Sequence, residues 1–157
     1  MRILVTGGAG FIGRHLGPEL RRAGHDVRVL DLQRPSGGSR PDPGFRFTRG
    51  SVLDPALVDR LIAGADLVIH LAAIAEPAEY GRRPKATMDT NILGSLHVAA
   101  SAARHSVPVL FASSSEVYGL NPNLPWREDA RSVFGSVEDV RWCYAASKLA
   151  AEHYHHA

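Results

Sequence analysis

Short runs of apolar residues recur along the chain, and segments with helical spacing separate them. The runs predict buried strands at residues 2–6, 27–32, 45–48, 66–71 and 108–112. Helices are predicted at residues 11–23, 55–63, 84–104 and 141–156. Residues 35–44 are rich in Pro, Gly and Ser and predict a loop, and residues 119–140 predict an irregular stretch.

Strands that alternate with helices and are apolar throughout indicate a parallel sheet covered on both faces. Right-handed crossovers then predict an α/β fold, a Rossmann-like doubly wound parallel sheet with strand order 3-2-1-4-5. Pro18 predicts a kink or a shorter first helix, and Gly94 is expected to interrupt the helix over 84–104. Ligands of such sheets bind beyond the carboxyl ends of the strands, here between the first and fourth strands.

Composition and charge narrow the class of protein. The chain has 157 residues, 45% of them hydrophobic, which suits one domain with a buried core. A formal charge of +2 and scattered arginines indicate a mildly basic surface, so we expect no nucleic-acid partner. The single cysteine, Cys143, excludes an internal disulfide framework. Because no apolar run reaches the ~18–20 residues that span a bilayer, we expect a cytoplasmic protein with no membrane partner.

A glycine cluster follows the first strand and opens the first helix, with Gly7, Gly10 and Gly13 at regular spacing. Such glycines permit a sharp turn and a close approach of the backbone to a pyrophosphate, which the helix N-terminus also attracts. Asp31 ends the second strand, where a carboxylate can accept hydrogen bonds from both ribose hydroxyls and repel a 2′-phosphate. The pattern therefore predicts NAD as the cofactor, and Arg34 leaves NADP as the less favoured one.

Tyr144 and Lys148 lie four residues apart on the last predicted helix and so share one face. A free tyrosine has a pKa of about 10 and is a poor base at neutral pH. We expect the ammonium of Lys148 and the positive charge of oxidised nicotinamide to lower that pKa. Tyr144 would then take a proton from a substrate hydroxyl while a hydride leaves the same carbon.

A series of motifs runs along the whole chain. They are the glycine segment at residues 6–13, His70-Leu71-Ala72-Ala73, Asn91-Ile92-Leu93-Gly94-Ser95, Ser113-Ser114-Ser115-Glu116-Val117-Tyr118-Gly119, and Tyr144 with Lys148. In this order they resemble the extended short-chain dehydrogenase/reductase family, in its NAD-dependent nucleotide-sugar epimerase/dehydratase group. One position departs, because Ser51 stands where the family usually carries an Asp that contacts the adenine. The resemblance implies cofactor contacts at Gly7, Gly10, Phe11, Ile12, Gly13, Asp31, Ser51, Val52, Leu71, Ala72, Ala73, Asn91, Tyr144 and Lys148.

The resemblance also implies a reaction centre of Ser114, Glu116, Tyr144 and Lys148. In it, Ser114 would hydrogen-bond the reacting oxygen and Lys148 would hold the nicotinamide ribose. Members of this group act on nucleotide-sugars, so a nucleotide-sugar substrate is expected. We expect an epimerase first, in which Tyr144 is the base and the hydride passes to NAD and then returns.

Alternatives to the epimerase stay open. One is a nucleotide-sugar uronate decarboxylase that uses Glu116, because Glu79-Tyr80 with Arg83-Pro84 resembles a segment of those enzymes. Another is an NAD-binding module without catalysis, or a regulatory protein that senses NAD. A dehydratase is disfavoured, because Ser115 stands where the acidic Asp of the dehydratases would be.

The chain resembles only the N-terminal part of these enzymes. Residues 1–157 are therefore expected to form an incomplete NAD-binding domain, truncated before the last strands and the small C-terminal substrate domain. Family members commonly form homodimers, which here would use the helices at 84–104 and 141–156. No metal is expected, because no carboxylate or cysteine completes a site with the histidines at 153, 155 and 156. The nucleotide and the sugar are left open.

Overall fold

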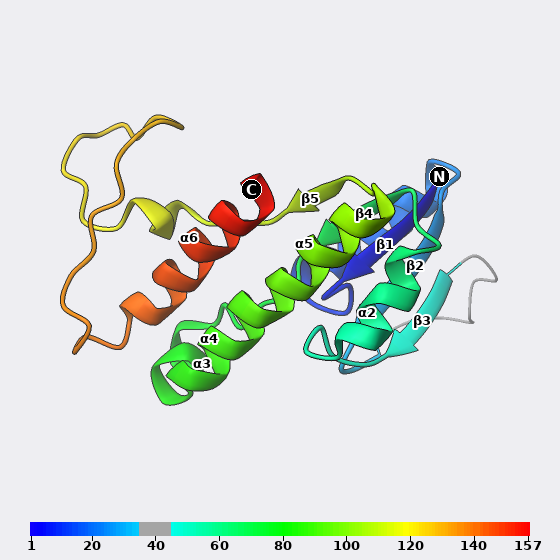
Figure 1. Cartoon of the computed structure of the whole chain (residues 1–157), viewed down its shortest axis with the longest axis horizontal. Helices are drawn as coiled ribbons and strands as arrows, with labels where there is room; N and C mark the ends of the chain where they lie inside the picture. The colour runs from blue at the N-terminus through cyan, green and yellow to red at the C-terminus, as the bar shows by residue number, and fades with distance from the viewer. Residues whose placement is uncertain (35–44) are drawn as a thin grey trace.

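The computed structural model describes residues 1–34 and 45–157, and this part of the chain is built on a single parallel sheet. Its strands are β1 (Arg2–Thr6), β2 (Asp26–Asp31), β3 (Phe45–Arg49), β4 (Leu67–His70) and β5 (Val109–Phe111). Their order is β3-β2-β1-β4-β5 (Figure 1), which confirms the predicted order. The order reverses between β1 and β4, so the carboxyl ends of these two strands frame the expected binding crevice. The loop predicted over residues 35–44 lies outside the described residues.

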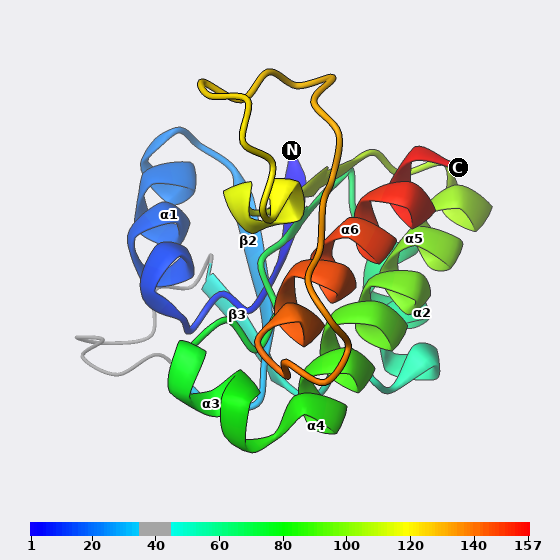
Figure 2. The same cartoon turned by 90° about the vertical axis from the view of Figure 1, so that its left-hand side faces the viewer.

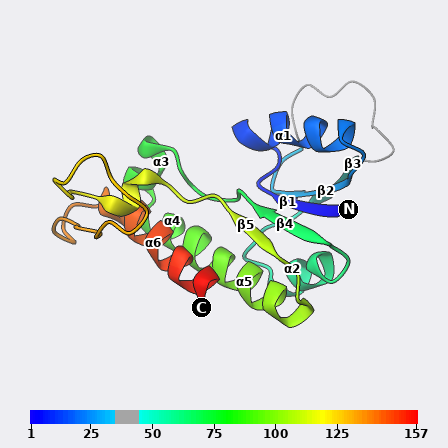
Figure 3. The same cartoon turned by 90° about the horizontal axis from the view of Figure 1, so that it is seen from above.

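Helices cover both faces of the sheet. The helix α1 (Phe11–Arg22) lies on one face, whereas α2 (Pro55–Ile62) and α5 (Gly94–His105) lie on the other. The C-terminal helix α6 (Trp142–His156) runs beside α5 (Figures 2 and 3). Among the described helices, none is both long enough and apolar enough to cross a membrane.

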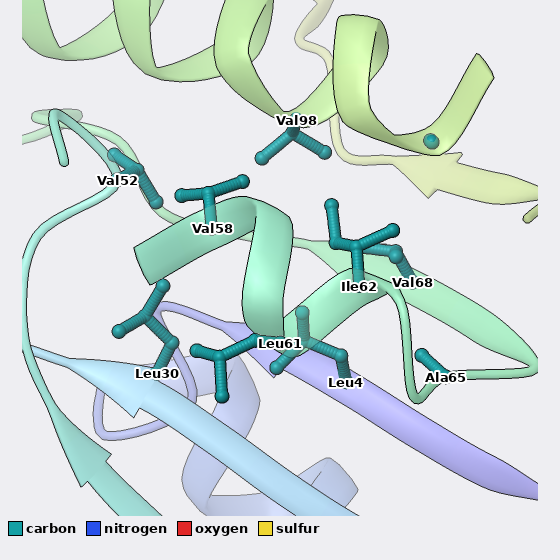
Figure 4. Packing of buried hydrophobic residues seen from close by; sticks show 10 residues of the cluster. Leu4, Leu30, Val52, Val58, Leu61, Ile62, Ala65, Val68 and Val98 are labelled. Carbon is teal, nitrogen blue, oxygen red and sulfur yellow. The ribbon is translucent and has the colours of Figure 1, made fainter. Parts of the chain in front are cut away.

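Each face of the sheet has its own apolar cluster, because successive side chains of a strand point to opposite faces. Ile3 and Val5 of β1 face α1, whereas Leu4 faces α2 and α5. The α1 cluster contains Ile3, Val5, Val27, Val29 and Ile69, with Leu16 and Leu20 of α1 packed against it. The second cluster contains Leu4, Leu30, Val52, Val58, Leu61, Ile62, Ala65, Val68, Val98 and Ala102 (Figure 4). Burial of each such Val, Leu or Ile side chain contributes about 1.5–3 kcal/mol, so these clusters hold the sheet in place.

The helix predicted over residues 84–104 is a series of shorter segments: α4 (Pro84–Met88), a π-helical turn η1 (Asp89–Leu93), and α5. A further helix, α3 (Pro77–Arg82), precedes them and was missed by the sequence pattern. Gly94 keeps helical backbone angles (φ −60°, ψ −45°), so the expectation that it interrupts the helix is wrong. Gly94 is needed for space instead, because a Cβ there would lie 2.5 Å from Cγ2 of Val52. The first helix also runs through Pro18 without ending.

The stretch after β5 is irregular, as predicted. It begins with a short 3₁₀ turn, η2 (Ser115–Tyr118), and Gly119 then forms an isolated bridge with Val133. The backbone N–H of Leu120 donates to the carbonyl of Val133 at 2.7 Å. This stretch, drawn in yellow and orange, lies away from the sheet and leads into α6 (Figure 1).

A buried imidazole ties the centre of the sheet to α5. His70, at the end of β4, is fully buried; its Nδ1 lies 2.6 Å from Oγ1 of Thr6 and its Nε2 lies 3.0 Å from Oγ of Ser95. A neutral imidazole satisfies both hydroxyls, because one ring nitrogen donates and the other accepts. Burial, with smaller contributions from the nearby charges of His155 and Lys148, lowers the pKa of His70 from 6.5 to about 3.

We predict that His70 makes the folded state sensitive to acid. Below pH 6.5 His70 binds a proton in the unfolded chain but stays neutral in the folded protein. The contribution of His70 to the free energy of unfolding is therefore fully present above this pH and is lost as the pH falls towards 3. Between about pH 7 and pH 5, the free energy of unfolding measured with urea should therefore fall less in the His70→Gln variant than in the wild type. The exposed His156→Gln variant is the control and should keep the wild-type slope. Equal slopes in all three proteins would contradict this assignment.

Candidate active site

The glycine loop between β1 and α1 is shaped by close backbone contacts. Gly7 has φ +70°, and a Cβ there would lie 2.6 Å from the backbone nitrogen of Ala72. At Gly13 a Cβ would lie 2.4 Å from Cα of Gly8. Only glycine fits both positions, so the loop can pass directly over the end of β4 and turn into α1.

The start of α1 suits an anion. Its N-cap is Gly10, which provides no side-chain cap, so the first N–H groups of the helix, including those of Phe11 and Ile12, have no side-chain acceptor there. The side chains of Phe11 and Ile12 are exposed at this end of the helix. A loop that a Cβ would fill, followed by an uncapped helix N-terminus, fits a pyrophosphate.

Asp31 lies beside this loop at the carboxyl end of β2. Its Oδ2 accepts a hydrogen bond from the backbone N–H of Ala9 at 2.9 Å, and its Oδ1 accepts one from Gln33 at 3.2 Å. The carboxylate is therefore fixed next to the glycine loop, where the sequence predicts a contact with the ribose of the cofactor. Arg34 lies with its guanidinium 5.3 Å from the ring centroid of Phe47, so it is held over an aromatic face.

The segments after β3 and β4 form the rest of the expected cofactor surface. Leu71, Ala72 and Ala73 are half-buried directly after β4. The hydroxyl of Ser51 accepts a hydrogen bond from the N–H of Leu53 at 3.1 Å, so it stabilises its own turn. The side chain of Val52 is buried in the core cluster, which leaves only its backbone for a ligand.

Asn91 lies deeper than the other residues predicted to contact the cofactor. It belongs to the π-helical turn η1 and is only 1% exposed. Its Oδ1 accepts from the backbone N–H of Ile74 at 2.8 Å, and its Nδ2 donates to the carbonyl of Ile74 at 3.2 Å. The same Nδ2 donates to Oγ of Ser147 at 3.0 Å. In the described structure this amide joins protein segments to one another.

The predicted reaction centre comes together at the start of α6. The hydroxyl of Ser114 and the carboxylate of Glu116 both lie close enough to the Tyr144 phenol to affect its pKa, Ser114 by lowering it and Glu116 by raising it. Tyr80 of α3 stacks on the ring of Tyr144, with centroids 5.2 Å apart and planes within 10°. Tyr80 was not predicted as a site residue. The signal that could have found it was its segment's resemblance to the decarboxylases.

Lys148 joins α6 to the end of β5. Its Nζ donates to the carbonyl of Ala112 at 2.7 Å and lies 4.7 Å from the ring centroid of Phe111. The side chain is 4% exposed, and burial lowers its pKa from 10.5 to about 8. This ammonium therefore fixes the strand that leads into Ser114.

The electrostatics of Tyr144 differ from the expectation. Burial raises the pKa of the phenol, the hydrogen bond from Ser114 lowers it, and the charge of Glu116 raises it. The lowering expected from Lys148 is not found, because Lys148 is not among the groups that shift this pKa and burial is the largest cause. Among the described residues, Ser114 is the group that lowers the pKa and so favours the phenolate.

Glu116 carries a buried oxygen without a partner. Its Oε2 is inaccessible to solvent and has no hydrogen-bond partner among the described residues. Glu116 lies in η2, two residues after Ser114, whose hydroxyl caps this segment by accepting from the Glu116 N–H at 3.2 Å. A buried carboxylate oxygen that lacks a donor indicates a position at which a proton or a ligand hydroxyl would be stabilised.

The strand order and the glycine loop after β1 define a Rossmann-like fold of the dinucleotide-binding kind. A family model described as the NAD dependent epimerase/dehydratase family matches residues 3–157, and the chain belongs to this family. The match covers all the motifs on which the family resemblance was based.

Two curated relatives with about one third of their residues identical to this chain are named as decarboxylases. The chain is 34% identical over 154 residues to a UDP-N-acetyl-alpha-D-glucosaminuronate decarboxylase of Bacillus cytotoxicus, covering 96% of this chain and 48% of the relative. It is 35% identical to UDP-glucuronic acid decarboxylase 1 of Danio rerio, covering 96% and 36%. The solved structure of the Bordetella bronchiseptica enzyme WbmG with NAD and UDP has a TM-score of 0.81 and 29% identity, covering 99% and 49%. The chain thus spans less than half the length of each of these proteins.

We predict that Gly7→Ala damages both the fold and the cofactor site. The new Cβ would meet the backbone at Ala72 and force a positive φ on alanine, at a cost of about 2–3 kcal/mol in the free energy of unfolding. Gly64→Ala is the matched control, because nothing lies within 4 Å of a Cβ at that position. It should change stability by no more than about 0.5 kcal/mol in urea unfolding. Similar effects of the two substitutions would contradict the proposed close contact.

Proposed function

We propose that this chain carries the NAD site and the reaction centre of a nucleotide-sugar uronate decarboxylase. The observation that carries this proposal is the buried Oε2 of Glu116, which has no hydrogen-bond partner in the described part of the chain and whose carboxylate affects the pKa of the Tyr144 phenol. The names of the relatives from Bacillus cytotoxicus and Danio rerio support the decarboxylase alternative better than the epimerase that was expected first. The substrate class is then a UDP-linked sugar whose carboxylate is attached to the carbon adjacent to the one that is oxidised.

The residues at the start of α1 and the end of β2 would hold the cofactor. The N–H groups after Gly10 would bind the pyrophosphate, and Asp31 would accept hydrogen bonds from the ribose hydroxyls. When bound, NAD supplies a hydride acceptor and later the donor of the same hydride. The oxidised nicotinamide also adds a positive charge, which opposes the effect of burial on Tyr144.

The proton steps would belong to Tyr144, Ser114 and Glu116. The Tyr144 phenolate would accept the proton of a sugar hydroxyl, and Ser114 would hold that oxygen through its hydroxyl. Oxidation of this hydroxyl to a ketone turns the sugar into a β-keto acid. The β-keto acid loses CO₂ and leaves an electron pair on the carbon that carried the carboxylate. Glu116 would then hold the proton that returns to this carbon, since its Oε2 is shielded from water and has no hydrogen-bond partner in residues 1–34 and 45–157.

Replacing Tyr144 tests the assignment of the base. In the presence of NAD and UDP-glucuronate, Tyr144→Phe should lower CO₂ release by about 10²–10⁴-fold, because no phenol remains to take the proton. The Kd of NAD should stay close to the wild-type value. Tyr154→Phe changes an exposed tyrosine of the same helix and should keep the wild-type rate. If Tyr144→Phe retained the wild-type rate, the assigned base would be wrong.

Glu116→Gln tests the decarboxylase against the epimerase. The variant should release CO₂ from UDP-glucuronate at least about tenfold more slowly, because the amide cannot carry the proton. Glu138→Gln, at an exposed position of the same irregular stretch, is the control and should keep the rate. Interconversion of UDP-glucose and UDP-galactose, with no CO₂ released from UDP-glucuronate, would favour the epimerase and reject the decarboxylase.

Two further expectations stay predictions. A homodimer through residues 84–104 and 141–156 is consistent with the exposure of Leu93 and Tyr154 on these helices. Analytical ultracentrifugation of the chain would test it. The expected cytoplasmic location likewise stays a prediction.

A further inference from the structure

A buried serine connects the reaction centre to a distant turn. Ser147 of α6 is fully buried, and its Oγ donates a hydrogen bond to the carbonyl of Tyr144 at 2.7 Å. The same oxygen accepts a hydrogen bond from Nδ2 of Asn91 at 3.0 Å. Ser147 therefore lies between the residue that carries the phenol and the residue that carries the ammonium, Lys148, and it is bonded to a third segment.

The other end of this connection is rigid. Asn91 lies in the π-helical turn η1. Its side-chain amide accepts a hydrogen bond from the backbone N–H of Ile74 and donates one to the carbonyl of the same residue. A π-helical turn inside a longer helix is rare and is found frequently at functional sites. Here the turn brings the amide within reach of both Ile74 and α6. Through Asn91, the segment that follows β4 is therefore joined to the first turns of α6.

The hydroxyl is not explained by helix formation alone. Alanine would form this helix better, and a serine that bonds back to its own helix competes with the backbone ladder. A buried hydroxyl is tolerated when its donor and acceptor capacities are both used, as they are at Ser147. The Nδ2 of Asn91 donates to the carbonyl of Ile74 and to the Oγ of Ser147, so one of its two N–H groups would lose its acceptor without the Ser147 oxygen. The pair thus selects one position of α6 relative to η1.

That position matters at Tyr144. The groups that face its phenol are Ser114 and Glu116 from the segment after β5, and the ring of Tyr80 from α3. Each of them comes from an element other than α6, so a small displacement of α6 would change all of these contacts together. Lys148 is the nearest cation on the same helix, and it is bonded to Ala112.

We propose that Ser147 is a positioning residue, which through Asn91 fixes the turn of α6 that holds Tyr144 and Lys148 against Ser114 and Tyr80. This inference rests on the proposed function in taking Tyr144 as the base. Ser147 itself would touch neither the substrate nor the cofactor. Its effect would be seen in the surroundings of the Tyr144 phenol.

The test follows Tyr144 directly and needs no turnover. The full chain is labelled with ¹³C at the ring Cζ of tyrosine, and Tyr144→Phe assigns the Tyr144 signal. In Ser147→Ala the signal should shift and its titration midpoint should rise by about 0.5 unit or more, because the phenol moves relative to the Ser114 hydroxyl that lowers its pKa. The signals of Tyr118 and Tyr154 should not move.

Ser101→Ala is the matched control. Ser101 is a buried serine of α5 (3% exposed) whose hydroxyl donates to Asp59, far from the reaction centre in sequence and in its contacts. It should leave the Tyr144 signal unchanged even where the two variants lose similar thermal stability. Ser147→Thr keeps the hydroxyl and should restore the wild-type midpoint. If Ser147→Ala does not fold, Ser147→Cys fills the site with a slightly larger side chain that is only a weak hydrogen-bond donor and acceptor, and it should shift the midpoint in the same direction.

The outcomes separate this inference from the proposed function. A Tyr144 signal that is as unchanged in Ser147→Ala as in Ser101→Ala would overturn the positioning role, whatever the rate of turnover. A shifted signal in Ser147→Ala that Ser147→Thr restores would support the role, even if Tyr144→Phe showed that another residue is the base. Where UDP-glucuronate is turned over, Ser147→Ala should lower kcat about tenfold or more and leave KM nearly unchanged.

Discussion

The contact between Thr6 and His70 fixes the two central strands at the point where the strand order reverses. It is a buried hydrogen bond between side chains at the carboxyl ends of β1 and β4, and Ser95 extends it to α5. A buried polar group that lost its partner there would carry its full desolvation cost, so the strands keep one register. The glycine loop depends on that register, because Gly7 passes over the backbone of Ala72 with no room for a side chain.

Much of the fold follows from local patterns. Apolar runs such as Leu67–His70 and the helical spacing between them are local properties, and right-handed crossovers then leave few possible strand orders. The places of Gly7, directly after β1, and of Asp31, at the end of β2, could be predicted for the same reason. The face shared by Tyr144 and Lys148 follows from helical spacing alone.

The remaining features of the site depend on packing between distant segments. The pKa of Tyr144 rises because Tyr80 and neighbouring groups bury it, and α3 has too few residues to show a clear helical pattern. The partners of Asn91 are Ile74 and Ser147, which lie far from it in sequence. The sequence pattern predicts that Gly94 interrupts the helix, whereas in the structure the close approach of the Val52 side chain leaves no room for a Cβ at this position. No pattern within one segment contains such information.

A crystal structure of this chain with bound NAD would test the central claim most directly, which is that the glycine loop and the start of α6 form one cofactor site. We expect the pyrophosphate at the N–H groups of Phe11 and Ile12, the adenosine ribose at Asp31, and the nicotinamide facing the Tyr144 phenol. NAD bound away from the glycine loop, or a nicotinamide out of reach of Tyr144, would contradict the account.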